Sequence, residues 1–408
     1  MKIKIKENKK YANIVNFKKN QDIAIHRWFN IKEGYSKELI VSLINDLKIK
    51  NGYIVDFFDG SGTTSLSAKE MNFKYYGFEI NPFLHLLSIV KLSDYKEKDI
   101  KKIISTKKRI LKDYKKISKI KNIKLSILEK VFKENLKDIL KIRTKIFNIK
   151  NKKVKNFFII AMTSILDDVG YAKKDGNGLK YPKNKKPVKF ITKFSEKIDL
   201  MIDDIIQSKN KNVKGSRAIL ADSRNISTKG LKRIKGKVSL VVFSPPYANC
   251  FDYSEVYKLE LWLSGCVNNY KDLINIRNKS LSSHLNKNLS SYEEYNLLKK
   301  DLEKLNKKII WSSKISHMLN GYFCDMEKIL KNSFDILSKN GYCVIVVGNS
   351  AYGGHIIETD VLLSKIALKI GFLNAEINIA RKLRASSQQA KLFKNNNSLR
   401  ESVIIVKK

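Results

Sequence analysis

The chain has 408 residues, enough for one large or two ordinary domains, and a hydrophobic content of 43% that can fill a substantial core. Its 81 lysines and arginines against 39 acidic residues give a formal charge of +42, which favours a polyanionic partner such as nucleic acid. No apolar run approaches the roughly 20 residues of a membrane span, which argues against a membrane protein.

Other features of the composition narrow the expected class of protein. The four cysteines lack the spacing of a zinc site or of a disulfide framework, and the first residues, MKIKIKENKK, lack an apolar signal core. We therefore expect a cytoplasmic protein without a metal. Lysine, asparagine and isoleucine are all abundant, as an AT-rich genome would produce, so the charge indicates little about where a nucleic acid would bind.

The first predicted helix follows a stretch rich in aromatic residues. Residues 25–29 read IHRWF, and apolar residues at helical spacing then run from residue 39 to 47, with Ser36 placed to cap the helix. Trp28 fits a packed core and a ligand-binding loop equally well at this point.

A glycine-rich turn follows the next predicted strand. Residues 53–64 read YIVDFFDGSGTT, in which an apolar strand leads into a turn whose glycines permit close approach of a ligand. A second strand over residues 75–78 ends in Glu79, about 20 residues after Asp59, as in folds that bind a nucleotide ribose. No GK[ST] follows the turn, which excludes a P-loop, and the acid at Asp59 favours a ligand with a positive centre.

Two further strand ends complete the predicted site. Between them and the first pair lies a lysine-rich helical stretch, residues 96–214, which fits either solvated helix faces or a nucleic-acid contact surface. A strand over residues 218–221 then ends at Asp222, and the apolar run 238–243 ends at Ser244. Because parallel strands meet ligands at their carboxyl ends, we expect these strand ends to converge on one crevice.

The fourth strand end is a corner formed by Ser244, Pro245, Pro246 and Tyr247. Two prolines cannot continue the strand, and they leave rigidly held carbonyl groups as free acceptors. A planar ring that carries an amine could donate to Ser244 and to the Pro245 carbonyl while it stacks on Tyr247. Taken alone, the same four residues also fit a simple exit from strand to loop.

The remaining chain completes an α/β fold. We expect a Rossmann-like, doubly wound, mostly parallel seven-stranded sheet with a C-terminal antiparallel hairpin, plus helical insertions. Arg381 to Gln389, at the tip of that hairpin, and the insertions could hold phosphates or read base edges. The expected segments are the first catalytic part (1–95), the basic helical insertion (96–214), the middle catalytic part (215–263), a second insertion for DNA contact or target recognition (264–317) and the last catalytic part (318–408).

With these motifs in order, the chain resembles the S-adenosylmethionine-dependent amino-methyltransferases of DNA, and most closely the cytosine-N4 branch of type II restriction-modification methylases. SPPY and FDGSGT are distinctive, and the order of the motifs is highly specific. The proline motif comes late, unlike the family branch in which it leads. The resemblance covers most of the chain outside the insertions and is carried by HRWFNIKEGYSKEL, FDGSGTTSLSAKEMNFKYYGFEINPF, LADSR, SPPYANCFDYSEVYKLELW, GYCVIVVGN and RESVIIVKK.

The resemblance implies a cofactor, a partner and residue roles. S-adenosylmethionine would bind with its methionine part against the turn after the first strand, its ribose at Glu79 and its adenine amine at Asp222. The loop at Trp28 and Ser36 would close over the methionine end. Duplex DNA is the implied substrate, a cognate restriction endonuclease is a candidate second partner, and the target base would lie at the corner. The implied turn residues are Asp59, Gly60, Ser61, Gly62 and Thr63, and the implied corner residues are Ser244, Pro245, Pro246 and Tyr247.

Several alternatives stay open at this stage. Serine at the first corner position favours cytosine-N4 over adenine-N6 only by family preference. An RNA base-amine methyltransferase and a non-catalytic DNA-binding subunit also fit the composition. Cys250 follows the corner within a loop, which is not the position of a carbon-5 methylation nucleophile, so we interpret it as a small packed residue.

Overall fold

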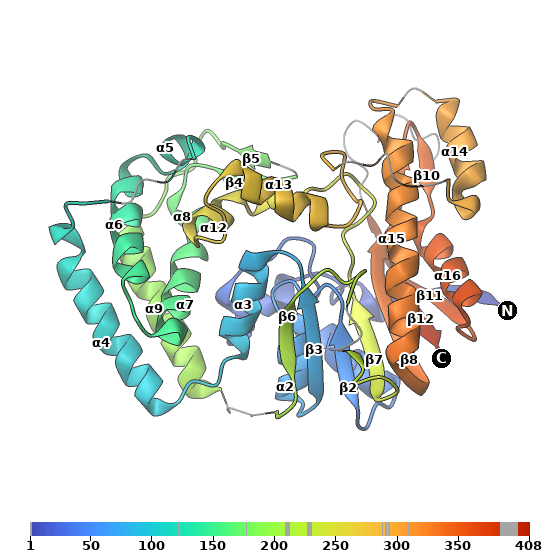
Figure 1. The fold of residues 1–408 in the computed structure, drawn as a ribbon, viewed down its shortest axis with the longest axis horizontal. Coiled ribbons are helices and arrows are strands. Elements are labelled where there is room, and N and C mark those ends of the chain that lie inside the picture. The colour runs from blue at the N-terminus through green and yellow to red at the C-terminus, as the bar shows by residue number, and fades with distance from the viewer. Residues whose placement is uncertain are drawn as a thin grey trace.

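The computed structural model describes residues 2–120, 123, 125–176, 178–208, 213–226, 231–287, 289, 292, 294–308, 310–383 and 399–408. Figure 1 shows a central sheet with a group of helices on one side of it and α15 and α16 on the other. Within the described ranges no helix is both long and apolar enough to cross a membrane, and no cluster of histidine, cysteine and acidic side chains could hold a metal ion.

The main sheet has eight strands in the order β1-β11-β12-β8-β7-β2-β3-β6 (Figure 1). Neighbours from β6 to β8 are parallel, whereas β12 runs antiparallel to both β8 and β11. The predicted α/β class with a mostly parallel sheet is therefore confirmed. The strands are β1 (Ile3–Glu7), β2 (Tyr53–Asp56), β3 (Lys74–Glu79), β6 (Arg217–Leu220), β7 (Val238–Phe243), β8 (Leu337–Gly348), β11 (Ala375–Leu383) and β12 (Leu399–Lys407).

The eighth strand departs from the seven that we predicted. Strand β1 pairs in parallel with β11 and forms one edge of the sheet. Its sequence alternates isoleucine with lysine, which has the period of a strand, and lysines are typical of exposed edges. We had considered only the charge of this segment, and charge alone does not indicate a strand.

Helices cover both faces of the sheet and also fill much of the segment that we predicted as the first insertion. Helices α1 to α3 pack on one face of the sheet and α15 and α16 on the other. The helices are α1 (Lys37–Asp46), α2 (Thr63–Glu70), α3 (Pro82–Leu92), α4 (Glu97–Asp113), α5 (Ile127–Phe132), α6 (Leu136–Phe147), α7 (Lys152–Thr163), α8 (Leu166–Val169), α9 (Phe190–Gln207), α11 (Tyr253–Val256), α12 (Lys258–Leu263), α13 (Tyr270–Lys279), α14 (Lys299–Asn306), α15 (Lys314–Ile336) and α16 (Thr359–Ile370).

Alternating side chains of the central strand supply the two cores. Leu240 and Val242 of β7 belong to the core on the α1 to α3 side, and Val241 and Phe243 belong to the core under α15 and α16. A strand buried on both faces reads as a continuous apolar run, as residues 238–243 do. Two small antiparallel ladders lie outside the main sheet, β4 (Lys173–Asp175) with β5 (Gly178–Lys180) and β9 (Ser350–Tyr352) with β10 (His355–Ile357).

Candidate active site

A cavity of about 100 Å³ lies at the carboxyl ends of β2, β3 and β7. Of the predicted site residues, Gly60, Glu79, Ser244 and Pro246 line it. They come from three of the four strand ends that we expected to converge on one crevice, and Asp222, at the fourth, lines an adjoining cavity. The other lining residues are Ile31, Lys32, Glu33, Phe58, Ile80, Asn81, Leu84, Phe251, Tyr253, Ser254, Ile276, Ser280, Leu281, Ser283 and His284.

Glu79 is fixed by backbone donors at the end of β3. One carboxylate oxygen accepts from the Gly60 amide at 2.9 Å and the other from the Asn81 amide at 2.7 Å. Burial raises the pKa of Glu79 from 4.5 to about 7, because the charged form loses its hydration. Glu79 also lines the cavity, where a ligand hydroxyl could donate to its carboxylate.

The glycine-rich turn requires glycine for two reasons. Gly62 has φ of 78°, in the left-handed region, and immediately precedes α2. A Cβ at this position would lie 2.7 Å from the Ser88 hydroxyl of α3. The turn therefore brings backbone close to both the cavity and the neighbouring helix. Ser61 and Thr63 are buried beside it with their hydroxyls 3.3 Å apart, and neither is among the residues that line the cavity.

Asp59 points away from the cavity. Its two oxygens accept from the hydroxyls of Ser65 and Ser88, each at 2.7 Å, and the missing side chain of Gly77 leaves room for its carboxylate. Burial raises the pKa of Asp59. The carboxylate thus holds the turn in place through its bonds to α2 and α3. The turn would contact a ligand through its backbone.

Asp56 is a buried acid that our sequence reasoning missed. Its carboxylate accepts from Tyr35, from Thr64 and from the Phe58 amide. Burial and the nearby Asp59 raise its pKa. An acid inside an otherwise apolar strand was the pattern that could have revealed it, because such a group needs dedicated partners.

The proline corner presents only part of itself to the cavity. Ser244 and Pro246 are half-buried and line it, whereas Pro245 is buried. The Tyr247 ring is 8% exposed and packs against Gly348, and its hydroxyl bonds to Glu401. Burial raises the pKa of Tyr247 well above 10. The cavity wall instead carries the aromatic rings of Phe251 and Tyr253, which follow the corner, and of Phe58 after β2.

Trp28 and Ser36 face the protein interior. The Trp28 indole donates to Asp204 of α9 at 2.9 Å, and its ring is fully buried. Ser36 precedes α1, but its hydroxyl bonds to the Ile14 carbonyl and does not cap the helix. Asn20 takes that role by accepting from the Lys37 amide. The part of this loop that lines the cavity is residues 31–33, which we had not singled out.

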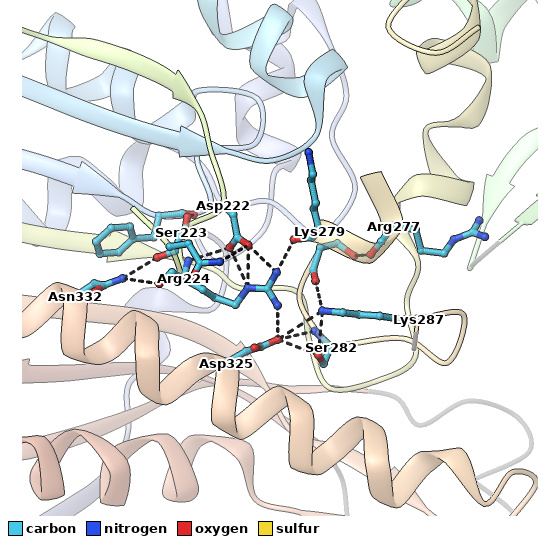
Figure 2. A network of polar contacts seen from close by, with 12 residues as sticks. Asp222, Ser223, Arg224, Arg277, Lys279, Ser282, Lys287, Asp325 and Asn332 are labelled. Carbon is cyan, nitrogen blue, oxygen red and sulfur yellow. Dashed lines mark hydrogen bonds and ion pairs between the residues drawn. The ribbon is translucent and has the colours of Figure 1, made fainter. Parts of the chain in front are cut away.

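Asp222 lies beside the cavity in the turn after β6. Its carboxylate binds the Arg224 guanidinium, with distances of 2.9 Å to Nε and 2.7 Å to Nη2 (Figure 2). It lines an adjoining cavity of about 480 Å³ that shares Ile80 and Ile276 with the first. Helix α13 lies above β3 and β6 in Figure 1, and its Ile276 lines both cavities.

The structure describes residues of the predicted second insertion and part of the predicted hairpin tip. Ser280 and His284, which belong to the segment that we predicted as the second insertion, lie on the cavity wall. The Arg381 side chain pairs with Glu401, the same residue to which the Tyr247 hydroxyl of the corner bonds. The predicted contact tip from residue 384 to Gln389 lies outside the described residues.

Comparisons with known proteins show which proteins the chain is similar to. Residues 3–91 match the model of the family described as DNA methylase, N6_N4_Mtase. The type II methyltransferase M.BsoBI of Geobacillus stearothermophilus is 26% identical over 97% of this chain and 88% of its own length. M.AvaI of Nostoc sp. is 24% identical over 97% of this chain and 89% of its own length. These similarities support a DNA methylase of the N4/N6 family.

Members of the DNA methylase family use S-adenosylmethionine as the methyl donor. The cavity fits such a group, because Asn81 projects a buried amide nitrogen, Nδ2, that has no hydrogen-bond partner among the described residues. Among solved structures, TrmN from Thermus thermophilus aligns with 90% of this chain and 48% of its own at 10% identity. Its TM-score is 0.28, which is too low to carry an argument.

Proposed function

We propose that this protein transfers a methyl group from S-adenosylmethionine to the exocyclic N4 amine of cytosine at a specific site in duplex DNA. The observation that carries the proposal is that Ser244 of the corner lines the same cavity as Gly60 and Glu79. The similarity to type II methyltransferases supports DNA as the substrate and a role in a restriction-modification system with a cognate endonuclease. The formal charge of +42 suits a polyanion.

The cofactor would be held mainly by backbone and by carboxylates. Gly60 and Glu79 would contact the methionine and ribose parts, and Asp222 would accept from the adenine amine. Asn81 supplies a further donor at the same edge. The remaining predicted residues would support the site without contacting the cofactor. The glycine-rich turn would be shaped by Asp59, Ser61, Gly62 and Thr63. The loop that ends at residues 31–33 would be anchored by Trp28 and Ser36.

The corner would orient the nucleophile. The exocyclic amine is a poor nucleophile because its lone pair is delocalised into the ring. If Ser244 and the Pro245 carbonyl accept its two N–H bonds, its lone pair is directed at the incoming methyl group, and orientation contributes most of the rate enhancement. A paired amine is inaccessible in the duplex, so the nucleotide would be flipped into the cavity. Tyr247 was our predicted stacking partner, and Tyr253 on the cavity wall is better exposed for that role.

The division of the chain stays a proposal as well. Residues 1–95, 215–263 and 318–408 would form the catalytic domain. Residues 96–214 and 264–317 would be insertions that contact DNA, the second of them carrying target recognition.

Product analysis tests the proposal directly. Duplex DNA of diverse sequence is incubated with the protein and isotopically labelled S-adenosylmethionine, digested to nucleosides and analysed by mass spectrometry. Labelled N4-methylcytosine is the expected product. N6-methyladenine would overturn the cytosine assignment, and label confined to transfer RNA in a parallel reaction would overturn DNA as the substrate. A protein that neither binds the cofactor nor transfers label would be a non-catalytic DNA-binding subunit.

A further inference from the structure

Arg224 joins three separate elements at the edge of the cofactor crevice. Its guanidinium donates to Asp222 through Nε and Nη2, to Asp325 of α15 through Nη1 at 2.9 Å, and to the Lys279 carbonyl at the end of α13 at 2.8 Å (Figure 2). Arginine suits this position because its donors are fixed in one plane and can serve several acceptors at once.

Asp325 is the second centre of this network. Its carboxylate is 1% exposed and also accepts from the backbone amide of Ser282 at 3.1 Å and from its hydroxyl at 2.9 Å. The Tyr292 hydroxyl donates to its other oxygen at 3.1 Å. A buried carboxylate is costly without paired partners, so Asp325 favours the arrangement in which Arg224, Ser282 and Tyr292 are all docked on α15.

The docked segment is the part of the second insertion that covers the crevice. Ser280, Leu281, Ser283 and His284 line the cavity that contains Ser244. Lys279 and Asp222 line the adjoining cavity. Arg224 therefore contacts two parts of the site. It binds Asp222, whose carboxylate we assigned to the adenine amine, and it binds the Lys279 carbonyl, which directly precedes the residues that cover the crevice.

We propose that Arg224 is a positioning residue that, through Asp325, locks the second insertion over the crevice and thereby sets the affinity for S-adenosylmethionine. The proposal rests on the proposed function, since it deepens the assignment of this crevice to the cofactor. Asp325 is not among the described residues that line the two cavities. In this proposal, a residue that does not contact the ligand therefore contributes to the binding energy.

The test measures equilibrium binding of S-adenosylmethionine in the absence of DNA, by calorimetry, for the full chain and its variants. Arg224→Lys keeps the charge but not the planar set of donors, and Asp325→Asn weakens the docking side alone. We expect each to raise the dissociation constant about tenfold, and the double variant to raise it by no more than that, because both act through one link. The kcat at saturating cofactor should stay within about twofold of wild type, so that the loss lies in KM.

A matched control is Arg143→Lys. Arg143 is 7% exposed and donates to the Leu263 carbonyl at 2.8 Å, away from both cavities. This variant should bind the cofactor as tightly as wild type. If Asp325→Asn does not fold, Ser282→Ala removes one bond to Asp325 and keeps the backbone amide, and a smaller but measurable loss of affinity is expected.

The outcomes distinguish failure of the positioning role from failure of the proposed function. Wild-type affinity in Asp325→Asn, or in Ser282→Ala where that variant replaces it, would overturn the positioning role even if DNA is methylated. Equal losses in Arg224→Lys and Arg143→Lys would also overturn it, because they would reflect general destabilisation. Failure of the wild-type protein to bind S-adenosylmethionine would instead reject the proposed function itself.

Discussion

The Tyr247 hydroxyl donates a 2.5 Å hydrogen bond to Glu401, which joins the proline corner after β7 to strand β12. Strand β8 lies between these two strands, so the bond crosses the carboxyl end of the sheet. Glu401 is 2% exposed, and its other oxygen accepts from Arg381 of β11. The position of the corner therefore depends on a buried carboxylate that is contributed by the C-terminal hairpin.

This bond makes Tyr247 primarily a structural part of the corner. Tyr247→Phe leaves one oxygen of a buried carboxylate without its donor, which should lower the free energy of unfolding by about 1–3 kcal/mol. Because the ring still packs against Gly348, methyl transfer should stay within about tenfold of wild type, whereas Tyr247→Ala should lose far more. Chemical denaturation and single-turnover assays check the two effects. Equal activity in Phe and Ala variants would show that the ring does not position the corner.

Ser244 should affect the chemical step and leave cofactor binding unchanged. Ser244→Ala removes one acceptor for the target amine, which should lower kcat about tenfold, the equivalent of one hydrogen bond of roughly 1.4 kcal/mol. Ser239 of β7, the strand that precedes Ser244, bonds to the Asn51 carbonyl and does not line the cavity, so Ser239→Ala is the control. Single-turnover kinetics with saturating cofactor measure the difference. A kcat equal in both variants would remove Ser244 from the mechanism.

The glycine-rich turn can be tested by a matched pair of alanine substitutions. Gly62 and Gly236 both have positive φ, at 78° and 72°, so alanine at either position adds about 1 kcal/mol of backbone strain. Only at Gly62 would the new Cβ also meet Ser88, at 2.7 Å, whereas at Gly236 nothing lies within 4 Å. Gly62→Ala should therefore lower the free energy of unfolding by roughly 1–3 kcal/mol more than Gly236→Ala. Equal losses in thermal unfolding would mean that Ser88 simply moves aside.

Cofactor affinity should depend on pH through Glu79. Burial raises the pKa of Glu79 to about 7, and only its ionised form offers all its lone pairs to ribose hydroxyls. The association constant for S-adenosylmethionine should therefore rise with pH between about 6 and 8 and then level off. Calorimetric titrations across this range measure it, with Glu79→Gln as a variant whose affinity should be lower and flat. A flat wild-type profile would contradict the role of the carboxylate.

The same group should affect stability with the opposite sign. Its pKa is higher in the folded state than the ordinary value of 4.5, so the folded protein binds the proton more tightly than the unfolded chain does. Its contribution to stability is complete below about pH 4.5 and is lost as the pH rises through about 7. Denaturant titrations of wild type and Glu79→Gln should diverge in this window, and parallel curves would argue against the raised pKa.

The strand predicted from its apolar run matches the structure closely. Residues 238–243 match β7 because a strand buried on both faces has little choice of side chain. Ser36 was a fair prediction from local rules, but Asn20, which lies 17 residues before Lys37, caps the helix instead. Local patterns cannot reveal a cap that tertiary folding supplies.

The site was predictable at the level of strand ends, but not of side-chain direction. Glu79 and Ser244 line the cavity as strand-end residues should. Asp59 is equally well placed along the chain, yet its carboxylate turns to Ser65 and Ser88 because Gly77 leaves space there. The roof formed by Ser280 to His284 comes from an insertion, whose position over the sheet no motif encodes.

The bonds of Asp204 bear on how the chain can be divided. This residue of α9 is fully buried and accepts from the Ile25 amide, from Arg27 and from the Trp28 indole. Helix α9 lies in the segment that we predicted to be an insertion, yet it completes the core beneath the loop that ends at residues 31–33. Removing residues 96–214 would thus leave an indole and a guanidinium without their acceptor. We therefore expect the two stretches to unfold together as one cooperative unit.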